Sequence, residues 1–402
     1  MVLLPLEGYV KAADFISLYQ SDSLVQTLAE GIRTSASKTL RIKGLTGSLD
    51  AVILAAVHRS VRANHLVILD DKEEAAVFFG DLQYLLGDKE VFFFPMSYKR
   101  PYEYDETENA NVLMRTEVLN LQGTRPGAQV IITYPEALSE KVITKKSLAS
   151  NTFVVQTKTT LDPSFLEEFL FSYDFEKTDF VYEAGQFAVR GGIIDVYSFA
   201  HDLPYRIELF GDEVESIRSF DPGSQLSVDA VDTVSLMPNI QTRLMQEERQ
   251  SLLEFMPPET RVWAKDIQRT TEVIQLCFEK VSEKFDRVLR EGGNTKVALE
   301  PHHLFVAADL LREQLKEASL IEFGSRATGK ASATLDFKSS PQPSFNKNFE
   351  LLAKNLLDHQ LQDYSNFIAA EQPRQLERLQ GIFEEIHPEL KFQPLELPLS
   401  RG

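Results

Sequence analysis

The sequence contains a single cysteine, Cys277, among 402 residues. One cysteine cannot form a disulfide within the chain, so a disulfide-stabilised scaffold is excluded. Its surroundings, residues 273–278 with the sequence VIQLCF, have the apolar character of a buried helix face. We therefore expect Cys277 to lie in the core as a small apolar side chain. A reducing, cytoplasmic location is expected as well, because disulfides are rare there.

Long apolar runs and an excess of positive charge are also absent. Glu7 and Lys11 interrupt the apolar start of the chain, which argues against a signal peptide. No uncharged run approaches the roughly 20 residues of a membrane-spanning helix. Lysine and arginine total 42 against 60 acidic residues, a formal net charge of −18. Broad DNA binding depends on lysine and arginine that displace counterions, so we expect neither an extended DNA-binding surface nor a membrane partner.

What remains is the composition of an ordinary globular protein, with 43% hydrophobic and 10% aromatic residues. A chain of this length suggests about two to four domains.

The clearest strand signal lies between residues 182 and 225. Residues 193–197 (IIDVY) are mainly β-branched and aromatic, and residues 205–209 alternate apolar and charged side chains with period two. Gly211-Asp212 separates this second run from a third that reaches Phe220. Because a glycine that leads a two-residue loop suits a type II′ turn, we predict a β-hairpin here.

Two blocks of this stretch, GQFAVRGGIIDV and PYRIELFGDEVESIRSFDP, closely resemble the second domain that bacterial transcription-repair coupling factors share with the excinuclease component UvrB. The match is long and keeps a fixed order and spacing. The resemblance implies a small domain that docks onto the excinuclease component UvrA, the damage-recognition ATPase.

A second motif resembles a phosphate-binding loop without its chemistry. Residues 39–42 read as a strand, residues 44–50 (GLTGSLD) as a glycine turn, and a helix follows from about Asp50. A working loop needs a lysine for the phosphates and then a serine or threonine hydroxyl for magnesium. Asp50 and Ala51 occupy those places, and the Asp50 carboxylate would repel phosphate oxygens. We expect a degenerate loop that binds no cofactor, with Gly44, Gly47, Asp50 and Ala51 as its marker residues.

The degenerate loop distinguishes between the two families whose shared domain the hairpin region resembles. UvrB has a working nucleotide site here, whereas the coupling factor has a degenerate one, so the sequence favours the coupling factor. The alternative is a nucleotide-binding ATPase of the UvrB type with a modified loop.

The fold class that we predict is α/β: a degenerate P-loop NTPase-like (RecA-like) domain with an inserted small α+β domain, followed by a small α/β domain. Strands are expected at 65–69, 91–94 and 130–133, and Asp70 and Asp71 are expected to cap a helix that starts at Glu73. Residues up to about Arg33, which precede them, have the apolar spacing of helix.

We predict the domain bounds as follows. Residues 1–152 form the first part of the P-loop-like domain, and residues 153–237 form the inserted domain that binds UvrA. Residues 238–340 return to the first domain with helices 241–255 and 267–289, and residues 341–402 form a third domain with strands 366–370 and 390–392 around helix 373–386.

Three further patterns have weaker interpretations. Residues 324–330 (GSRATGK) fit most of a phosphate loop, but Ala331 and the prolines after it favour a linker. The loop 98–104 mixes basic and aromatic residues, which favours nucleic-acid stacking, yet its acidic neighbours favour a solvated or packing loop. The adjacent pair His302-His303 lacks the spacing of metal ligands.

Arg190 is the first candidate for partner binding. It precedes Gly191-Gly192, and a guanidinium can hold a carboxylate through two hydrogen bonds. By resemblance, the family uses this arginine to bind UvrA. A second family arginine falls on Glu176 here, with Lys177 beside it. Phe187 is the expected apolar anchor and Arg206 a flanking charge; the alternative for Arg190 is an internal salt bridge that fixes the hairpin.

Taken together, these features predict the amino-terminal part of a transcription-repair coupling factor that recruits UvrA to stalled transcription complexes. We identify no catalytic residue and no metal site. The family continues with an RNA polymerase-binding domain and an ATP-driven DNA translocase, so the chain is expected to be a fragment whose contacts with RNA polymerase and DNA lie in regions absent here.

Overall fold

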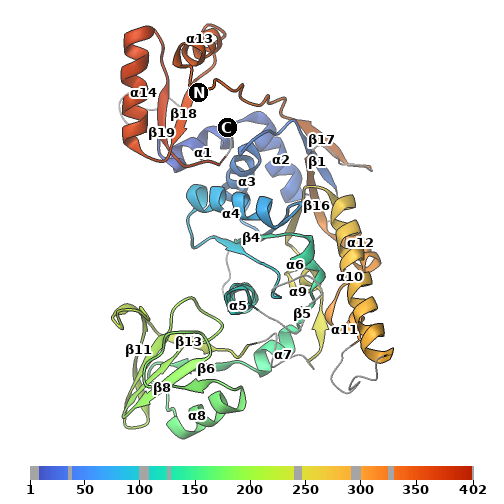
Figure 1. The fold of residues 1–402 in the computed structure, drawn as a ribbon, viewed down its shortest axis with the longest axis vertical. Coiled ribbons are helices and arrows are strands. Elements are labelled where there is room, and N and C mark those ends of the chain that lie inside the picture. The colour runs from blue at the N-terminus through green and yellow to red at the C-terminus, as the bar shows by residue number, and fades with distance from the viewer. Residues whose placement is uncertain are drawn as a thin grey trace.

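The computed structural model describes residues 9–34, 39–98, 108–124, 128–239, 247–290, 300–324 and 330–400. Figure 1 shows an elongated arrangement with a large central sheet, a second sheet at one end, and a small α/β unit at the other. The structure has a mixed α/β architecture, with a parallel sheet and a separate second sheet. This agrees with the predicted α/β class.

The central sheet has seven strands in the order β17-β1-β16-β15-β2-β4-β3. Every neighbouring pair is parallel. β2, β4 and β16 are buried throughout, as expected for a parallel sheet covered on both faces. The strands are β1 (Leu40–Lys43), β2 (His65–Ile68), β3 (Val91–Phe93), β4 (Val130–Thr133), β15 (Arg261–Ala264), β16 (Ser319–Phe323) and β17 (Ala333–Asp336).

Two strands from late in the chain lie inside this sheet. β15 and β16 lie between β1 and β2, so the chain returns from the second sheet to complete the first. β17 follows the linker expected at residues 324–330 and was not predicted. Ala333–Asp336 pairs with β1 as the edge strand.

Helices cover both faces of the central sheet. Figure 1 shows α3 and α4 on one side and α10 and α12 on the other. The bounds are α1 (Ala12–Gln20), α2 (Ser23–Thr34), α3 (Leu49–Ser60), α4 (Lys72–Leu86), α5 (Asn109–Thr124), α6 (Pro135–Ser139), α9 (Leu252–Phe255), α10 (Ile267–Arg290), α11 (Pro301–Leu304) and α12 (Ala308–Glu317).

Local chemistry explains where several helices begin. Asp71 caps α4, since its side chain accepts a hydrogen bond from the Glu74 N–H, whereas Asp70 makes no such cap. The helical region expected up to Arg33 consists of two helices, and the Asp22 carboxylate accepts from the N–H groups of Leu24 and Val25 at the start of α2.

The predicted helix 241–255 is wrong in its described part. Arg249 and Gln250 form the short strand β14, which pairs with β5 (Val142–Ile143). Only Leu252–Phe255 is helical, capped by Ser251 and followed by Pro257-Pro258. Residues 240–246 lie outside the described residues.

The second sheet has six strands in the order β12-β11-β10-β9-β8-β7. Gly211 has a φ of 63° in the turn between β10 and β11, as the predicted hairpin requires. Nearby lie the pair β6–β13 and the helices α7 and α8. The bounds are β6 (Phe153–Gln156), β7 (Glu176–Lys177), β8 (Gln186–Arg190), β9 (Ile193–Val196), β10 (Tyr205–Phe210), β11 (Glu213–Phe220), β12 (Ser227–Val231), β13 (Thr233–Leu236), α7 (Lys145–Ser150) and α8 (Pro163–Ser172).

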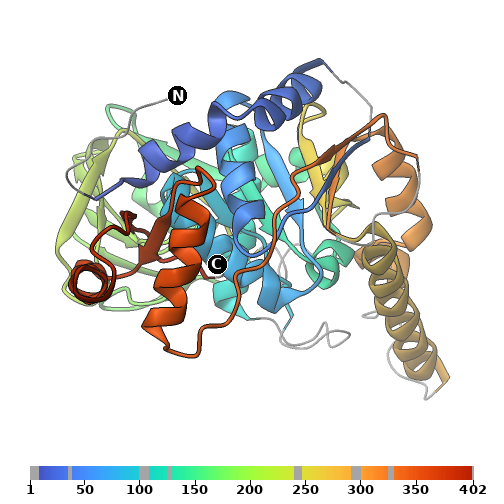
Figure 2. The same cartoon turned by 90° about the horizontal axis from the view of Figure 1, so that it is seen from above.

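The small unit at the other end contains α13 (Phe349–Gln360), β18 (Phe367–Ala370), α14 (Pro373–Ile386) and β19 (Gln393–Glu396). β18 and β19 are parallel, as a βαβ unit requires, but β19 begins after the predicted strand 390–392. Val10 adds a bridge to Leu395, which brings the start of the described chain onto this unit. Figure 2 shows the unit beside α1.

Cys277 is buried, as predicted. Among the helices that the structure describes, none combines the length and apolar character needed to span a membrane.

Candidate functional site

The glycine turn after β1 positions the first candidate site. Gly44 and Gly47 have φ values of 71° and 60°, and α3 begins at Leu49. A Cβ on Gly44 would lie 2.6 Å from the Lys338 nitrogen and from an Asp336 carboxylate oxygen. Glycine is therefore required at this position.

Asp50 points into a small cavity that also holds a lysine from the end of β15. The Lys265 ammonium pairs with Glu74 and lies 3.9 Å from the Asp50 carboxylate. Burial raises the pKa of Asp50 to about 6, although Lys265 and a hydrogen bond from the Ala51 N–H act in the opposite direction. The cavity is lined by Leu45, Gly47, Ser48, Asp50, Glu74, Val77, Phe78, Asp81, Lys265, Phe323 and Gly324.

The cavity measures about 110 Å³, well below the roughly 300 Å³ at which ligand pockets typically begin. The segment after β17 also lies across the turn. Ser339 donates to the Gly44 carbonyl from its N–H (2.9 Å) and its hydroxyl (2.6 Å), and its Oγ lies 2.8 Å from Oγ1 of Thr46. The turn is thus tied to the protein's own chain, and acidic side chains line the space beside it.

The second candidate site lies on one face of the six-stranded sheet. Asp195 is fully buried on β9 and accepts from two arginines. Arg206 on β10 donates from Nε at 2.8 Å and from Nη2 at 2.9 Å, and Arg190 on β8 pairs with the same carboxylate. Arg190 also donates to the Asp179 carbonyl at 2.6 Å. The structure therefore brings Arg190 and Arg206 together, in the internal ion pair that was the alternative for Arg190.

Both arginine side chains nevertheless remain accessible. The exposed fractions are 36% for Arg190 and 18% for Arg206. The hydrogen bond to Asp195 raises the pKa of Arg206 further, which keeps its charge fixed. After Arg190 the backbone turns through Gly191, at a φ of 61°, and Gly192. A Cβ on Gly192 would lie only 2.8 Å from the Leu209 carbonyl oxygen.

Phe187 cannot serve as the exposed anchor that was expected. It is fully buried, because residues three apart on a strand point to opposite faces and Phe187 points away from the Arg190 face into the core. Lys177 lies beside it, with its ammonium 5.9 Å from the Phe187 ring centroid and 2.6 Å from the Glu167 carboxylate. The four predicted residues thus form two groups on opposite faces of the sheet.

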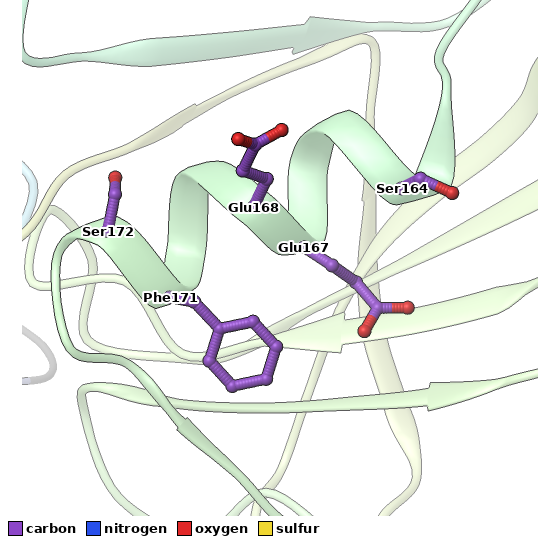
Figure 3. A pocket seen from close by; sticks show the side chains of 5 residues that line it. All are labelled: Ser164, Glu167, Glu168, Phe171 and Ser172. Carbon is purple, nitrogen blue, oxygen red and sulfur yellow. The ribbon is translucent and has the colours of Figure 1, made fainter.

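The face that carries Lys177 is covered by α8. Figure 3 shows Phe171 and Glu167 on one side of this helix and Glu168 on the other. Phe171 makes an edge-to-face contact with Phe187, at 5.1 Å between ring centroids. Lys177 therefore serves the packing of α8 on the sheet.

Two exposed aromatic residues in the segment before β8 were not predicted, and one of them contacts Arg190. Phe180 and Tyr182 are 50% and 55% exposed, while Val181 between them is fully buried. The Arg190 guanidinium lies over the Phe180 ring at 5.2 Å. Because all three of these side chains are apolar, the sequence alone does not separate the exposed pair from the buried valine.

The remaining candidates add no site. Residues 99–107 of the aromatic loop and residues 325–329 of the second glycine motif lie outside the described residues. Tyr98 is buried against Phe305. His302 lies on α11 with Nδ1 3.2 Å from the Glu300 carboxylate, and the described residues contain no group of three or more metal-ligating side chains.

Comparison with known proteins adds independent support. A family described as "UvrB interaction domain" matches residues 153–241, the segment that contains the six-stranded sheet. The chain is 33% identical to the transcription-repair-coupling factor of Myxococcus xanthus over 71% of this chain and 24% of that protein. It is 27% identical to the Bacillus subtilis factor over 58% of this chain and 19% of that protein.

The similarity to UvrB itself is weaker. The UvrABC system protein B of Thermotoga neapolitana is 22% identical over 65% of this chain and 40% of that protein. The matches span between about a fifth and two fifths of the length of these relatives. The chain is related to the transcription-repair-coupling factors, of which it represents the amino-terminal region with its UvrB-like module.

Proposed function

We propose that the chain recruits the excinuclease component UvrA to stalled RNA polymerase in transcription-coupled nucleotide excision repair. The observation that carries this proposal is the pair of accessible guanidiniums, Arg190 and Arg206, on one face of the UvrB interaction domain. On a chain with a net charge of −18, an accessible basic pair suits an acidic surface on a protein partner.

The docking domain is proposed to be an insertion, residues 153–237, within a RecA-like P-loop domain made of residues 1–152 and 238–340, with residues 341–402 as a third domain. The placement of β15 and β16 between β1 and β2 supports this division. Contacts with RNA polymerase and DNA are proposed to lie in other regions of the full-length protein.

We further propose that the chain binds no nucleotide and has no catalytic activity of its own. Asp50 and Glu74 place negative charge beside the glycine turn, and Lys265 is already paired with Glu74. The competing function is an ATPase of the UvrB type, which the strand-turn-helix context of the loop favours. Titration calorimetry with ATP and magnesium separates the two, since saturable micromolar binding would establish the ATPase.

The docking proposal is tested with Arg190→Ala and purified UvrA. Arg312→Ala is the matched control, because Arg312 is 49% exposed and pairs with Asp309 on α12, away from the six-stranded sheet. We expect Arg190→Ala to weaken binding about tenfold or more and Arg312→Ala to leave it unchanged. Equal affinity of wild type and Arg190→Ala would refute the assignment.

A further inference from the structure

Beyond the two arginines, we propose that Phe180 is the aromatic anchor of this surface and that Asp195 is a positioning residue. In this arrangement Asp195 aims both guanidiniums at a carboxylate of the partner. The inference rests on the proposed docking function and specifies the chemistry of that site.

The charge balance around Asp195 leaves the surface positive. Its Oδ1 accepts from Arg206, and its Oδ2 accepts from both Arg206 and Arg190. The single negative charge of Asp195 is thus shared by two arginines, and the three groups together carry one net positive charge. Because Asp195 is fully buried while Arg190 is 36% exposed, the outer side of the guanidinium stays open to a second carboxylate.

The buried carboxylate also fixes the direction of the arginines. An isolated arginine on a strand samples many rotamers, and binding must order it at an entropic cost. Arg190 is instead held at one nitrogen by Asp195 and at another by the Asp179 carbonyl, and the Phe180 ring lies against it. The guanidinium is therefore ordered before any partner arrives.

The segment that carries Phe180 is held equally firmly. The Thr178 hydroxyl donates to the Phe180 carbonyl at 2.9 Å. The Gln186 side chain accepts from the Tyr182 N–H at 3.0 Å, and Val181 is buried beside Ala188 and Phe220. Phe180 thus exposes half of its surface from a fixed backbone, which is the property of an aromatic hot spot.

The partner that fits this surface is a segment of UvrA with an aspartate or glutamate next to an apolar side chain. The carboxylate would meet Arg190, and the apolar side chain would lie on Phe180 and Tyr182. An uncharged or basic segment would offer no carboxylate to the outer side of the guanidinium.

Phe180→Ala tests the anchor without disturbing the core. Phe210→Ala is the matched control, because Phe210 is the more exposed phenylalanine, at 81%, and lies at the β10–β11 turn. Affinity for purified UvrA is measured by titration calorimetry. We expect Phe180→Ala to weaken binding about tenfold and Phe210→Ala to leave it unchanged; equal affinity of Phe180→Ala and wild type overturns the anchor.

Asp195→Asn tests the positioning role, because it keeps the shape and removes the charge. Asp309→Asn is its control, since it removes a carboxylate from the Arg312 pair on α12, away from this sheet. We expect the Asp195 variant to weaken binding at least about fivefold, although it adds a net positive charge that would by itself strengthen attraction to an acidic partner. Tighter or unchanged binding by Asp195→Asn refutes the role.

Folding is checked by circular dichroism and thermal unfolding of each variant. If Asp195→Asn unfolds, Asp195→Glu replaces it, and a folded Asp195→Glu protein with wild-type affinity also refutes the role, because the longer side chain shifts both arginines. Failure of the docking function itself is distinguishable: in that case the wild-type chain does not bind UvrA at all.

Discussion

The Lys265 ammonium lies 3.9 Å from the Asp50 carboxylate and pairs more closely with Glu74. Lys265 follows β15, more than two hundred residues after Asp50, so the pairing depends on the return of the chain to the central sheet. One lysine facing two carboxylates leaves an excess of negative charge. Where a nucleotide site would offer cations to phosphates, this turn offers carboxylates.

We expect Asp50→Asn to stabilise the protein at neutral pH. Burial raises the pKa of Asp50 from 3.8 to about 6, so keeping the carboxylate charged in the folded state costs about 2–3 kcal/mol above pH 6. The cost shrinks as the pH falls through 6 and is nearly gone at about pH 3, below both pKa values. Urea unfolding followed by fluorescence of Trp263, the only tryptophan, should show this gain at pH 7.5 and less than about 1 kcal/mol of it at pH 4. A loss of stability at pH 7.5 would contradict it.

Acid should destabilise the central sheet through His65. Burial lowers the pKa of this histidine to about 3, and its Nδ1 accepts a hydrogen bond from Trp263 at 3.0 Å. The unfolded state takes up a proton near pH 6.5 and the folded state does not, so stability falls by about 1.4 kcal/mol per pH unit between pH 6.5 and 3.

The variant His65→Asn isolates this contribution. The asparagine Oδ1 can accept from Trp263 in place of Nδ1, but it does not titrate. Its stability at pH 7.5 will be lower because packing is lost, so the quantity to compare is the slope. We expect a shallower loss between pH 6 and pH 4.5 than in wild type. Parallel curves would show that His65 does not carry the effect.

The glycine turn makes a separate prediction for Gly44. Alanine there must adopt a φ of 71° and would collide with the Lys338 nitrogen. We expect Gly44→Ala to lower the free energy of unfolding by roughly 2–4 kcal/mol. Gly80→Ala, inside α4 with open space around its Cβ, should be neutral or stabilising by up to about 1 kcal/mol. The same urea titrations measure both, and equal effects would contradict the assigned strain.

Elements specified by nearby residues could be predicted from the sequence. Asp71 marks the start of α4 and Gly211 the β10–β11 turn through contacts with their close neighbours. β17 and β14 could not be predicted in this way. Ala333–Asp336 is extended because it pairs with β1, and Arg249–Gln250 because it pairs with β5, each far away in the sequence.

In the candidate site, too, features set by nearby residues could be predicted and features set by the fold could not. Arg190 could be found from its position before two glycines, and its partner Asp195 lies only five residues away. That Phe187 faces the core could have been inferred, because it lies an odd number of residues from Arg190 on one strand. The exposed Phe180 was missed because its segment forms no strand, and only the fold shows that it lies against Arg190.

The opposite placement of Arg190 and Lys177 leads to a last prediction. Lys177 is 43% exposed but lies on the α8 side of the sheet, paired with Glu167. Lys177→Ala should therefore leave the affinity for UvrA within about twofold of wild type, because an exposed ion pair away from the contact contributes little. Arg190→Ala, measured alongside it by titration calorimetry, should lose about tenfold. If instead Lys177→Ala loses affinity and Arg190→Ala does not, the partner docks on the α8 side and the surface proposed around Arg190 and Phe180 is the wrong one. If both variants lose affinity while both stay folded, the partner must reach around the β7 edge of the sheet, where Lys177 and the segment leading to Phe180 follow each other directly.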